Sequence, residues 1–87
     1  MKTFPLLISS PDSELFRGEA EMLILRGTEG DLAVMAGHVP FVTAVVKGRC
    51  VLVTADGRKE GTIEDGLLKV DHAQVTVLTS ALTFETP

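Results

Sequence analysis

CVLVTADGRKEGTI, residues 50–63, contains two runs of strand-forming residues with an Asp-Gly pair between them. Apolar and β-branched residues fill positions 50–54, and a second run returns from Glu60 to Ile63. Asp56-Gly57 is typical of a tight hairpin turn, because aspartate and glycine tolerate positive φ angles. The stretch therefore predicts an antiparallel hairpin in the middle of the chain.

Turn signals of the same kind recur on both sides of this hairpin, roughly 8 to 12 residues apart, which is the spacing of an all-β sandwich or barrel. Apolar and polar side chains alternate with period two over residues 68–71 and 74–77. That alternation indicates half-buried strands, because successive side chains of a strand point to opposite faces. We therefore expect an all-β fold.

The segment FRGEAEMLILR, residues 16–26, has two interpretations. Its Glu, Ala, Met and Leu residues are good helix formers, which favours a helix. Gly18 interrupts the start of such a helix, and residues 19–24 alternate with period two. We expect one strand here.

Composition limits the classes of function. A chain of 87 residues supports one hydrophobic core, so we expect a single domain over residues 1–87. The net charge is −4 and the eight basic residues are scattered, which excludes the basic stripe of a nucleic-acid-binding protein. Cys50 is the only cysteine, so it forms no internal disulfide. No run approaches the roughly 18 apolar residues of a membrane span, so we expect membrane contact only through partners.

The glycine-rich stretch GTEGDLAVMAGHVP, residues 27–40, holds the candidate site residues. A phosphate loop would continue with a lysine, whereas Glu29 and Asp31 repel phosphate. A zinc site needs three or four ligands, and His38 with Asp31 falls short of that number. No Gly-x-Ser-x-Gly nucleophile motif occurs. We therefore expect no metal site, no cofactor and no catalytic residue.

Lys59 suggests one alternative function. Small all-β domains that carry lipoate or biotin present a lysine at a hairpin tip, and Lys59 follows the Asp56-Gly57 turn. Its context DGRKEG lacks the Asp-Lys-Ala or Met-Lys-Met surroundings of those carriers. A free-standing carrier or adaptor domain modified at Lys59 remains the alternative hypothesis.

Residues 9–45 and 65–80 together resemble the N-terminal domain of the epsilon subunit of F-type ATP synthases. The family motif GxEGelgilpGHaPlvt is matched in register by Gly27, Glu29, Gly30, Leu32, Gly37, His38 and Pro40. The resemblance implies a small β-sandwich of two mostly antiparallel sheets with about ten short strands. Ala36 stands where the family often has proline, which removes a constraint on φ at that corner.

The resemblance also implies a function. Such subunits are non-catalytic parts of the central stalk: they link the gamma subunit to the membrane c-ring and transmit torque for ATP synthesis driven by protons or sodium ions. They lie at the cytoplasmic face of the bacterial inner membrane. We expect this chain to lack the C-terminal helical hairpin that inhibits ATP hydrolysis in longer relatives.

Family positions imply three groups of site residues. Contacts with the gamma subunit fall on Ser10, Met35, His38 and Val42, and contacts with the c-ring on Glu29, Gly30 and Asp31. Gly27, Gly37 and Pro40 shape the loop. Val39, Phe41 and Val42 have two interpretations, as apolar interface or as core, because alternation does not distinguish an inner from a docking face.

Overall fold

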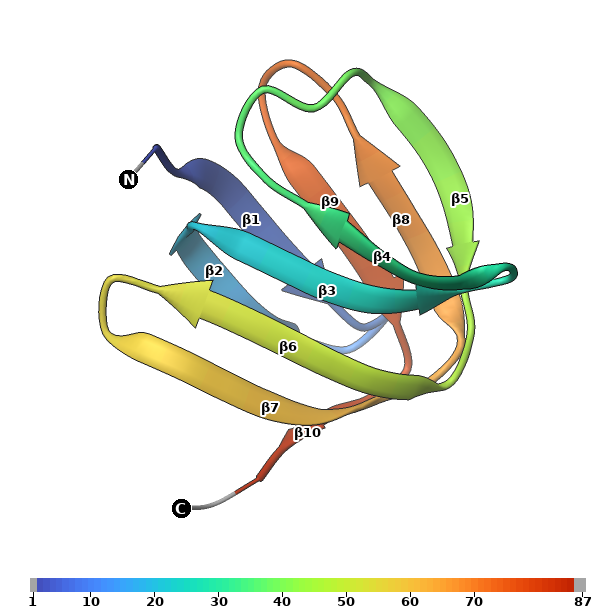
Figure 1. Cartoon of the computed structure of the whole chain (residues 1–87). Helices are drawn as coiled ribbons and strands as arrows, with labels where there is room; N and C mark the ends of the chain where they lie inside the picture. Colours follow the sequence, from blue (N-terminus) through green and yellow to red (C-terminus); the bar gives the residue numbers. More distant parts are fainter. Residues whose placement is uncertain (1, 86–87) are drawn as a thin grey trace.

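The computed structural model describes residues 2–85, which form ten strands (Figure 1). The strands are β1 (Phe4–Ser9), β2 (Glu14–Ala20), β3 (Met22–Gly27), β4 (Gly30–Val34), β5 (Phe41–Val45), β6 (Gly48–Thr54), β7 (Gly57–Ile63), β8 (Gly66–Val70), β9 (Val75–Thr79) and β10 (Leu82–Phe84). Strand is the regular structure of these residues throughout, because β-branched and aliphatic side chains alternate with polar ones between the turns.

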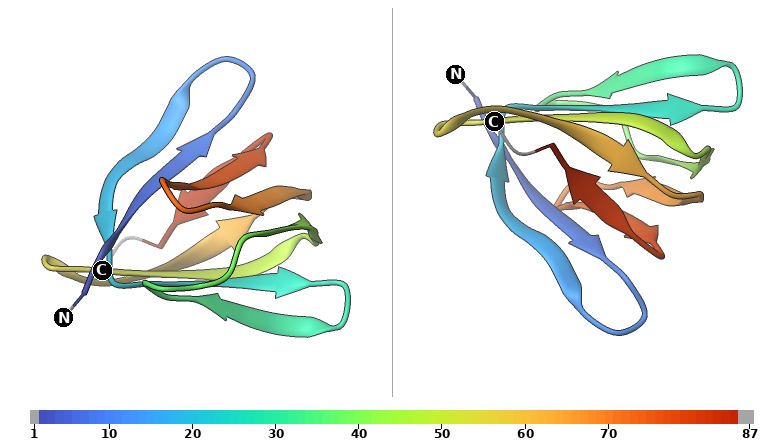
Figure 2. Two further views of the ribbon diagram at one scale, coloured as in Figure 1. Left: turned by 90° about the horizontal axis from the view of Figure 1, so that it is seen from above. Right: turned by 90° about the horizontal axis from the view of Figure 1, so that it is seen from below.

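The strands form two five-stranded sheets that pack face to face (Figure 2). Sheet I has the order β2-β1-β9-β8-β5, and sheet II has the order β10-β7-β6-β3-β4. β1 and β9 are parallel, and the other paired strands are antiparallel. The predicted small β-sandwich of mostly antiparallel sheets is confirmed.

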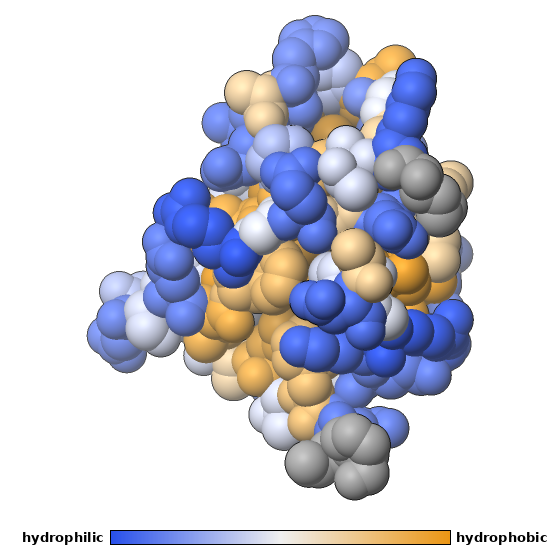
Figure 3. Space-filling model, turned by 90° about the vertical axis from the view of Figure 1, so that its left-hand side faces the viewer, coloured by the Kyte–Doolittle hydropathy of each residue, from blue (hydrophilic) through white to orange (hydrophobic). Residues whose placement is uncertain are grey.

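The core lies between the sheets and is built from aliphatic side chains of both. Its largest fully buried members are Leu6, Ile8, Leu23, Leu25, Leu52, Ile63, Leu68, Val34, Val77 and Cys50. Burial raises the pKa of the Cys50 thiol to about 11, so the thiol stays protonated at neutral pH. Apolar side chains also reach the surface along one side, where Figure 3 shows them between hydrophilic flanks.

The central hairpin is confirmed, and its turn differs in one detail from the prediction. β6 and β7 pair from Gly48–Ile63 to Thr54–Gly57, so Ala55 and Asp56 form the turn. Gly57 has a φ of 124°, whereas no residue of the described chain other than glycine has a positive φ. The Asp-Gly pair thus supplies one positive φ angle instead of two. The turn between β3 and β4 has the same form, with a φ of 119° at Gly30.

The expectation of one strand over residues 16–26 is wrong in one respect. The segment is extended, but it divides at Glu21 into β2 of sheet I and β3 of sheet II. Glu21 N donates a hydrogen bond of 2.7 Å to Val53 O at this corner. Ala20 and then Leu23 are fully buried, so the inward phase of the alternation shifts by one residue at the bend. Period two alone did not reveal this change of sheet.

The stretch expected to be one shaped loop, residues 27–40, is also divided. Thr28 and Glu29 form a tight turn, β4 follows, and only residues 35–40 form a loop before β5. Leu32 packs against the core and Val34 is fully buried, and this burial fixes β4 as a strand of sheet II. β4 therefore separates the candidate residues into two groups.

Candidate interaction surfaces

The first group lies at the turn between β3 and β4, and we call it the acidic tip: Glu29, Gly30 and Asp31. All three residues are exposed. Gly27 closes the turn by pairing with Gly30, and it is itself buried in β3. A Cβ atom at Gly27 would lie 2.9 Å from Leu32 Cδ2, so the chain is closely packed at this position. Two carboxylates thus stand on a tight, well-defined turn.

No ion pair or side-chain hydrogen bond engages either carboxylate of the acidic tip within residues 2–85. Asp31 lies opposite Arg26 in the pairing of β4 with β3, but the two side chains form no ion pair in that part of the chain. The tip is therefore free to pair with cationic or polar groups of another molecule.

The second group lies in the loop 35–40, at the other end of β4. Gly37 has a φ of 87°, a conformation that favours glycine, and its loop-shaping role stays a prediction. His38 Nε2 donates a hydrogen bond of 3.0 Å to Ala33 O, and its ring centroid lies 5.6 Å from that of Phe41. These contacts join the loop to β4 and β5, and no hydrogen bond joins His38 to Asp31 in residues 2–85.

The two interpretations of the apolar residues near this loop are now distinguished. Val39 is 73% exposed and Val42 is 59% exposed, so neither belongs to the core. Phe41 is half-buried and packs against the core. Met35 is 48% exposed, and Ala36 next to it packs against the core. Pro40 is exposed and directly precedes β5.

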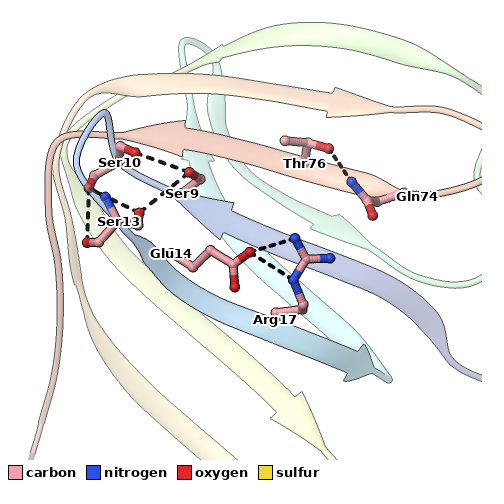
Figure 4. A network of polar contacts seen from close by, with 7 residues as sticks. All are labelled: Ser9, Ser10, Ser13, Glu14, Arg17, Gln74 and Thr76. Carbon is pink, nitrogen blue, oxygen red and sulfur yellow. Dashed lines mark hydrogen bonds and ion pairs between the residues drawn. The ribbon is translucent and has the colours of Figure 1, made fainter.

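Ser10 lies far from this loop, at the opposite end of sheet I. It belongs to the turn between β1 and β2, where Ser10 N donates to Ser13 O at 2.8 Å (Figure 4). Ser13 N donates in return to Ser10 Oγ at 3.1 Å. The strand register places Ser9 in one row with Leu78, whereas Phe41 pairs with Val70 at the other end of the sheet. The predicted gamma contacts thus occupy opposite corners of sheet I.

The outer face of sheet I, between these corners, carries two exposed leucines. Leu67 is 42% exposed and Leu78 is 50% exposed, and the two lie opposite each other on β8 and β9. Sequence reasoning missed both. The sequence did contain a signal for them. Each strand has a leucine at a position whose side chain points away from the core, because the neighbouring Leu68 and Val77 point into it.

Polar side chains border this apolar centre. Gln74 Nε2 donates to Thr76 Oγ1 at 3.1 Å, and Arg17 pairs with Glu14 at 2.6 Å on the edge strand β2 (Figure 4). Hydrogen bonding from Arg17 lowers the pKa of the Glu14 carboxyl. An apolar centre with a polar border is typical of protein interfaces.

The outer face of sheet II is built differently. Val51 points outward, because Cys50 and Leu52 on either side of it enter the core, yet it is fully buried. Glu60 lies directly opposite Val51 and pairs with Arg49 at 3.1 Å and Arg58 at 3.3 Å. Hydrogen bonds lower the pKa of the Glu60 carboxyl, and the bond from Arg49 has a larger effect than the bond from Arg58.

The other candidates carry less weight in the structure. Residues 2–85 contain no cluster of three or more potential metal ligands. Lys59 lies within β7, with Nζ 5.7 Å from the ring centroid of Phe84, so it is not at the hairpin tip where a carrier lysine would stand. No helix in the described range is long and apolar enough to cross a membrane.

Comparison with known proteins agrees with this architecture. Residues 3–85 match the family model described as ATP synthase, Delta/Epsilon chain, beta-sandwich domain. An ATP synthase epsilon chain of Ruminococcus albus is 35% identical over 83 residues, which are 94% of this chain and 62% of that protein. One of Frankia casuarinae is 38% identical over 72 residues, which are 82% of this chain and 85% of that protein.

A solved structure also shares the fold. It is a cryo-EM structure of the Euglena gracilis mitochondrial ATP synthase described as OSCP/F1/c-ring in rotational state 1. The TM-score is 0.86 at 20% identity, over 94% of this chain and 53% of that chain. The extent of the family match, over the same residues that form the two sheets, leads to one conclusion: the chain belongs to the ATP synthase delta/epsilon family, through its β-sandwich domain.

Proposed function

We propose that this protein is a non-catalytic subunit of the central stalk of an F-type ATP synthase, and that it holds the gamma subunit to the c-ring. The observation that carries the proposal is the division of residues 27–40 by β4. The acidic tip lies at one end of this strand and the loop 35–40 at the other. Two separate surfaces allow two partners to bind at the same time, as a linking subunit requires.

The gamma subunit would bind the outer face of sheet I. Ser10 and His38 lie at opposite corners of this sheet, so one partner that reaches both must cover the face between them. That face presents Leu67, Leu78 and Val42, all of them exposed. Its apolar centre supplies buried area, and the polar border, which includes Arg17 and Glu14, remains hydrated in the complex.

The c-ring would bind the acidic tip. Glu29 and Asp31 present carboxylates to solvent from a turn whose geometry is fixed by Gly30. Charge-assisted hydrogen bonds from basic or polar groups of the ring loops would fix the rotational register of the subunit. Gly27 and Leu32 hold the base of the turn by close packing.

The role we propose is mechanical. No bond is made or broken: the subunit transmits torque between the ring and gamma during ATP synthesis, with protons or sodium ions as the coupling ion. A close-packed sandwich suits this task because protein interiors have low compressibility. In a bacterium the subunit would lie at the cytoplasmic face of the inner membrane and reach the membrane through its partners. Inhibition of ATP hydrolysis by a helical hairpin is not part of this proposal.

Affinity purification from detergent extracts of the native organism tests the proposal. The tagged protein should recover the gamma subunit and the c-ring in stoichiometric amounts, and its mass should equal that of its sequence. Recovery of a soluble monomer with added mass on Lys59 would contradict the proposal and support a carrier domain. Calorimetry with ATP provides a second check, because we expect neither hydrolysis nor micromolar binding.

A further inference from the structure

We propose that a cleft beside the Ser9–Pro11 turn receives a bulky apolar side chain of the gamma subunit and so anchors it to sheet I. The proposal rests on the function proposed above and goes one step further, because it assigns a specific anchoring pocket. The cleft has a volume of about 400 Å³. It is lined by Ser9, Ser10, Pro11, Leu78, Thr79 and Ser80.

The surface of the cleft favours an apolar occupant. No charged side chain lines it, and its exposed surface is almost entirely apolar. Leu78, which is 50% exposed, forms one wall. Phosphate or carboxylate groups would find no cationic side chain in the lining, whereas a large apolar side chain would exchange water for carbon contacts on several sides.

Three of the four hydroxyl groups that line the cleft, those of Ser9, Ser10 and Thr79, have hydrogen-bond partners within residues 2–85, and the Ser80 hydroxyl has none there. Ser9 Oγ donates to Ser10 O at 3.1 Å, and Ser10 Oγ lies 3.2 Å from Ser13 O. Thr79 is buried, and its hydroxyl donates to Glu64 O at 3.0 Å. These bonds occupy three of the four hydroxyl donors in the lining, whereas a sugar or another polyhydroxylated ligand needs several free donors and acceptors.

Both walls of the cleft are fixed before a partner arrives. Ser10 N donates to Ser13 O at 2.8 Å and holds the turn that forms one wall. At the other wall, Glu64 N donates to Ala81 O at 3.1 Å, and Thr79 ties the end of β9 to the same corner. A preformed pocket binds more tightly than one that must be ordered on binding.

The position of the cleft identifies its occupant. Leu78 belongs both to the cleft and to the exposed pair with Leu67, so the cleft is continuous with the outer face of sheet I. A partner that spans this face from His38 to Ser10 places a side chain over the cleft. Buried anchors in pockets of this kind supply most of the affinity of an interface.

Filling the cleft in the full chain provides the test. Ser80→Phe places a ring in the lining, and Ala81→Phe adds the same bulk one residue away, at an exposed position outside the lining. Titration calorimetry with the purified gamma subunit of the same ATP synthase gives the affinities. We expect Ala81→Phe to bind like the wild type and Ser80→Phe to bind about 10- to 100-fold more weakly, the loss typical of a blocked anchor.

A direct measurement accompanies the variants. In the wild-type complex, the methyl groups of Leu78 should show intermolecular nuclear Overhauser effects to an apolar side chain of gamma. This readout applies even where Ser80→Phe lowers the melting temperature. Equal affinities for the two phenylalanine variants, or the absence of contacts to Leu78, would overturn the anchor while leaving the proposed function intact.

Two other outcomes are distinct from these. Failure of the wild-type chain to bind gamma at all would overturn the proposed function, and the anchor with it. Sedimentation of the isolated chain as a dimer that Ser80→Phe dissociates would assign the cleft to a second copy and overturn the gamma occupant.

Discussion

The outer faces of the two sheets differ in the exposure of the apolar side chains that point away from the core. On sheet I, Leu67 and Leu78 are exposed and face each other without a cover. On sheet II, Val51 points outward but is fully buried, next to Glu60 and its two arginine partners. One face is therefore open to a partner and the other is closed by its own side chains.

This difference shows that an apolar side chain on an outer face is not necessarily accessible to a partner. Long side chains such as arginine cover apolar surface with their methylene groups while their charged ends remain in water. On the outer face of sheet II, Arg49 and Arg58 pair with Glu60 beside Val51. On sheet I, Lys69 lies between Val42 and Thr76, and Leu67 and Leu78 remain exposed beside it.

The largest expected effect follows from a charge at the centre of the open face. Leu67→Asp should weaken binding of the gamma subunit about 100-fold, because an unpaired carboxylate would be buried at the interface. Thr62→Asp places the same charge at an exposed position on β7 of sheet II and should bind like the wild type. Calorimetric titration compares the two variants, and equal losses would erase the contrast between the faces.

The second prediction concerns the close packing of neighbouring strands within each sheet. A Cβ atom at Gly66 would overlap Leu78 O, and one at Gly61 would overlap Thr83 O. Gly66→Ala should lower the free energy of unfolding by about 3 kcal/mol, since β8 and β9 are both held inside sheet I. Gly61→Ala should cost about 1 kcal/mol, because β10 is a three-residue edge strand that can move away. Urea denaturation measures both, and the reverse order would show that β10 is the more rigid neighbour.

The acidic tip provides a third prediction, separate from both faces. Asp31→Lys should weaken association with the c-ring about tenfold while leaving the melting temperature of the isolated chain nearly unchanged, because the Asp31 side chain is exposed. Asp56→Lys is the matched control, since Asp56 lies in a turn of the same form at another hairpin. Pull-down with detergent-solubilised ring gives the comparison. A large loss of stability in Asp31→Lys alone would make Asp31 a structural residue.

The smallest effect concerns the ion pairs on the closed face. Because Arg49 and Arg58 lower the pKa of Glu60 below its ordinary value of 4.5, the folded state binds its proton less readily than the unfolded state. The stabilisation is therefore fully present above the ordinary pKa and is lost as the pH falls through the lower folded value. Wild type and Glu60→Gln should differ slightly in melting temperature at neutral pH and converge in acid. A difference that grows on acidification would contradict the role of these pairs.

Much of this fold follows from local patterns. The hairpin of residues 50–63 and the strands over residues 68–71 and 74–77 could be predicted, because turn residues and alternating apolar residues report on neighbouring positions alone. The division at Glu21 could not, because a strand that changes sheets keeps its extended backbone and shifts only the phase of burial. The order β2-β1-β9-β8-β5 likewise depends on pairings between distant segments.

For the interaction surfaces, local sequence specifies the residue types and the turns. The exposed acids of the tip, the glycine with positive φ at position 37 and the family motif are all local features. The exposure of Val42, the packing of Phe41 on the core and the open pair of Leu67 and Leu78 depend instead on how the two sheets meet. Alternation assigns side chains to the two faces of a strand, but the packing of one sheet on the other decides which face is buried.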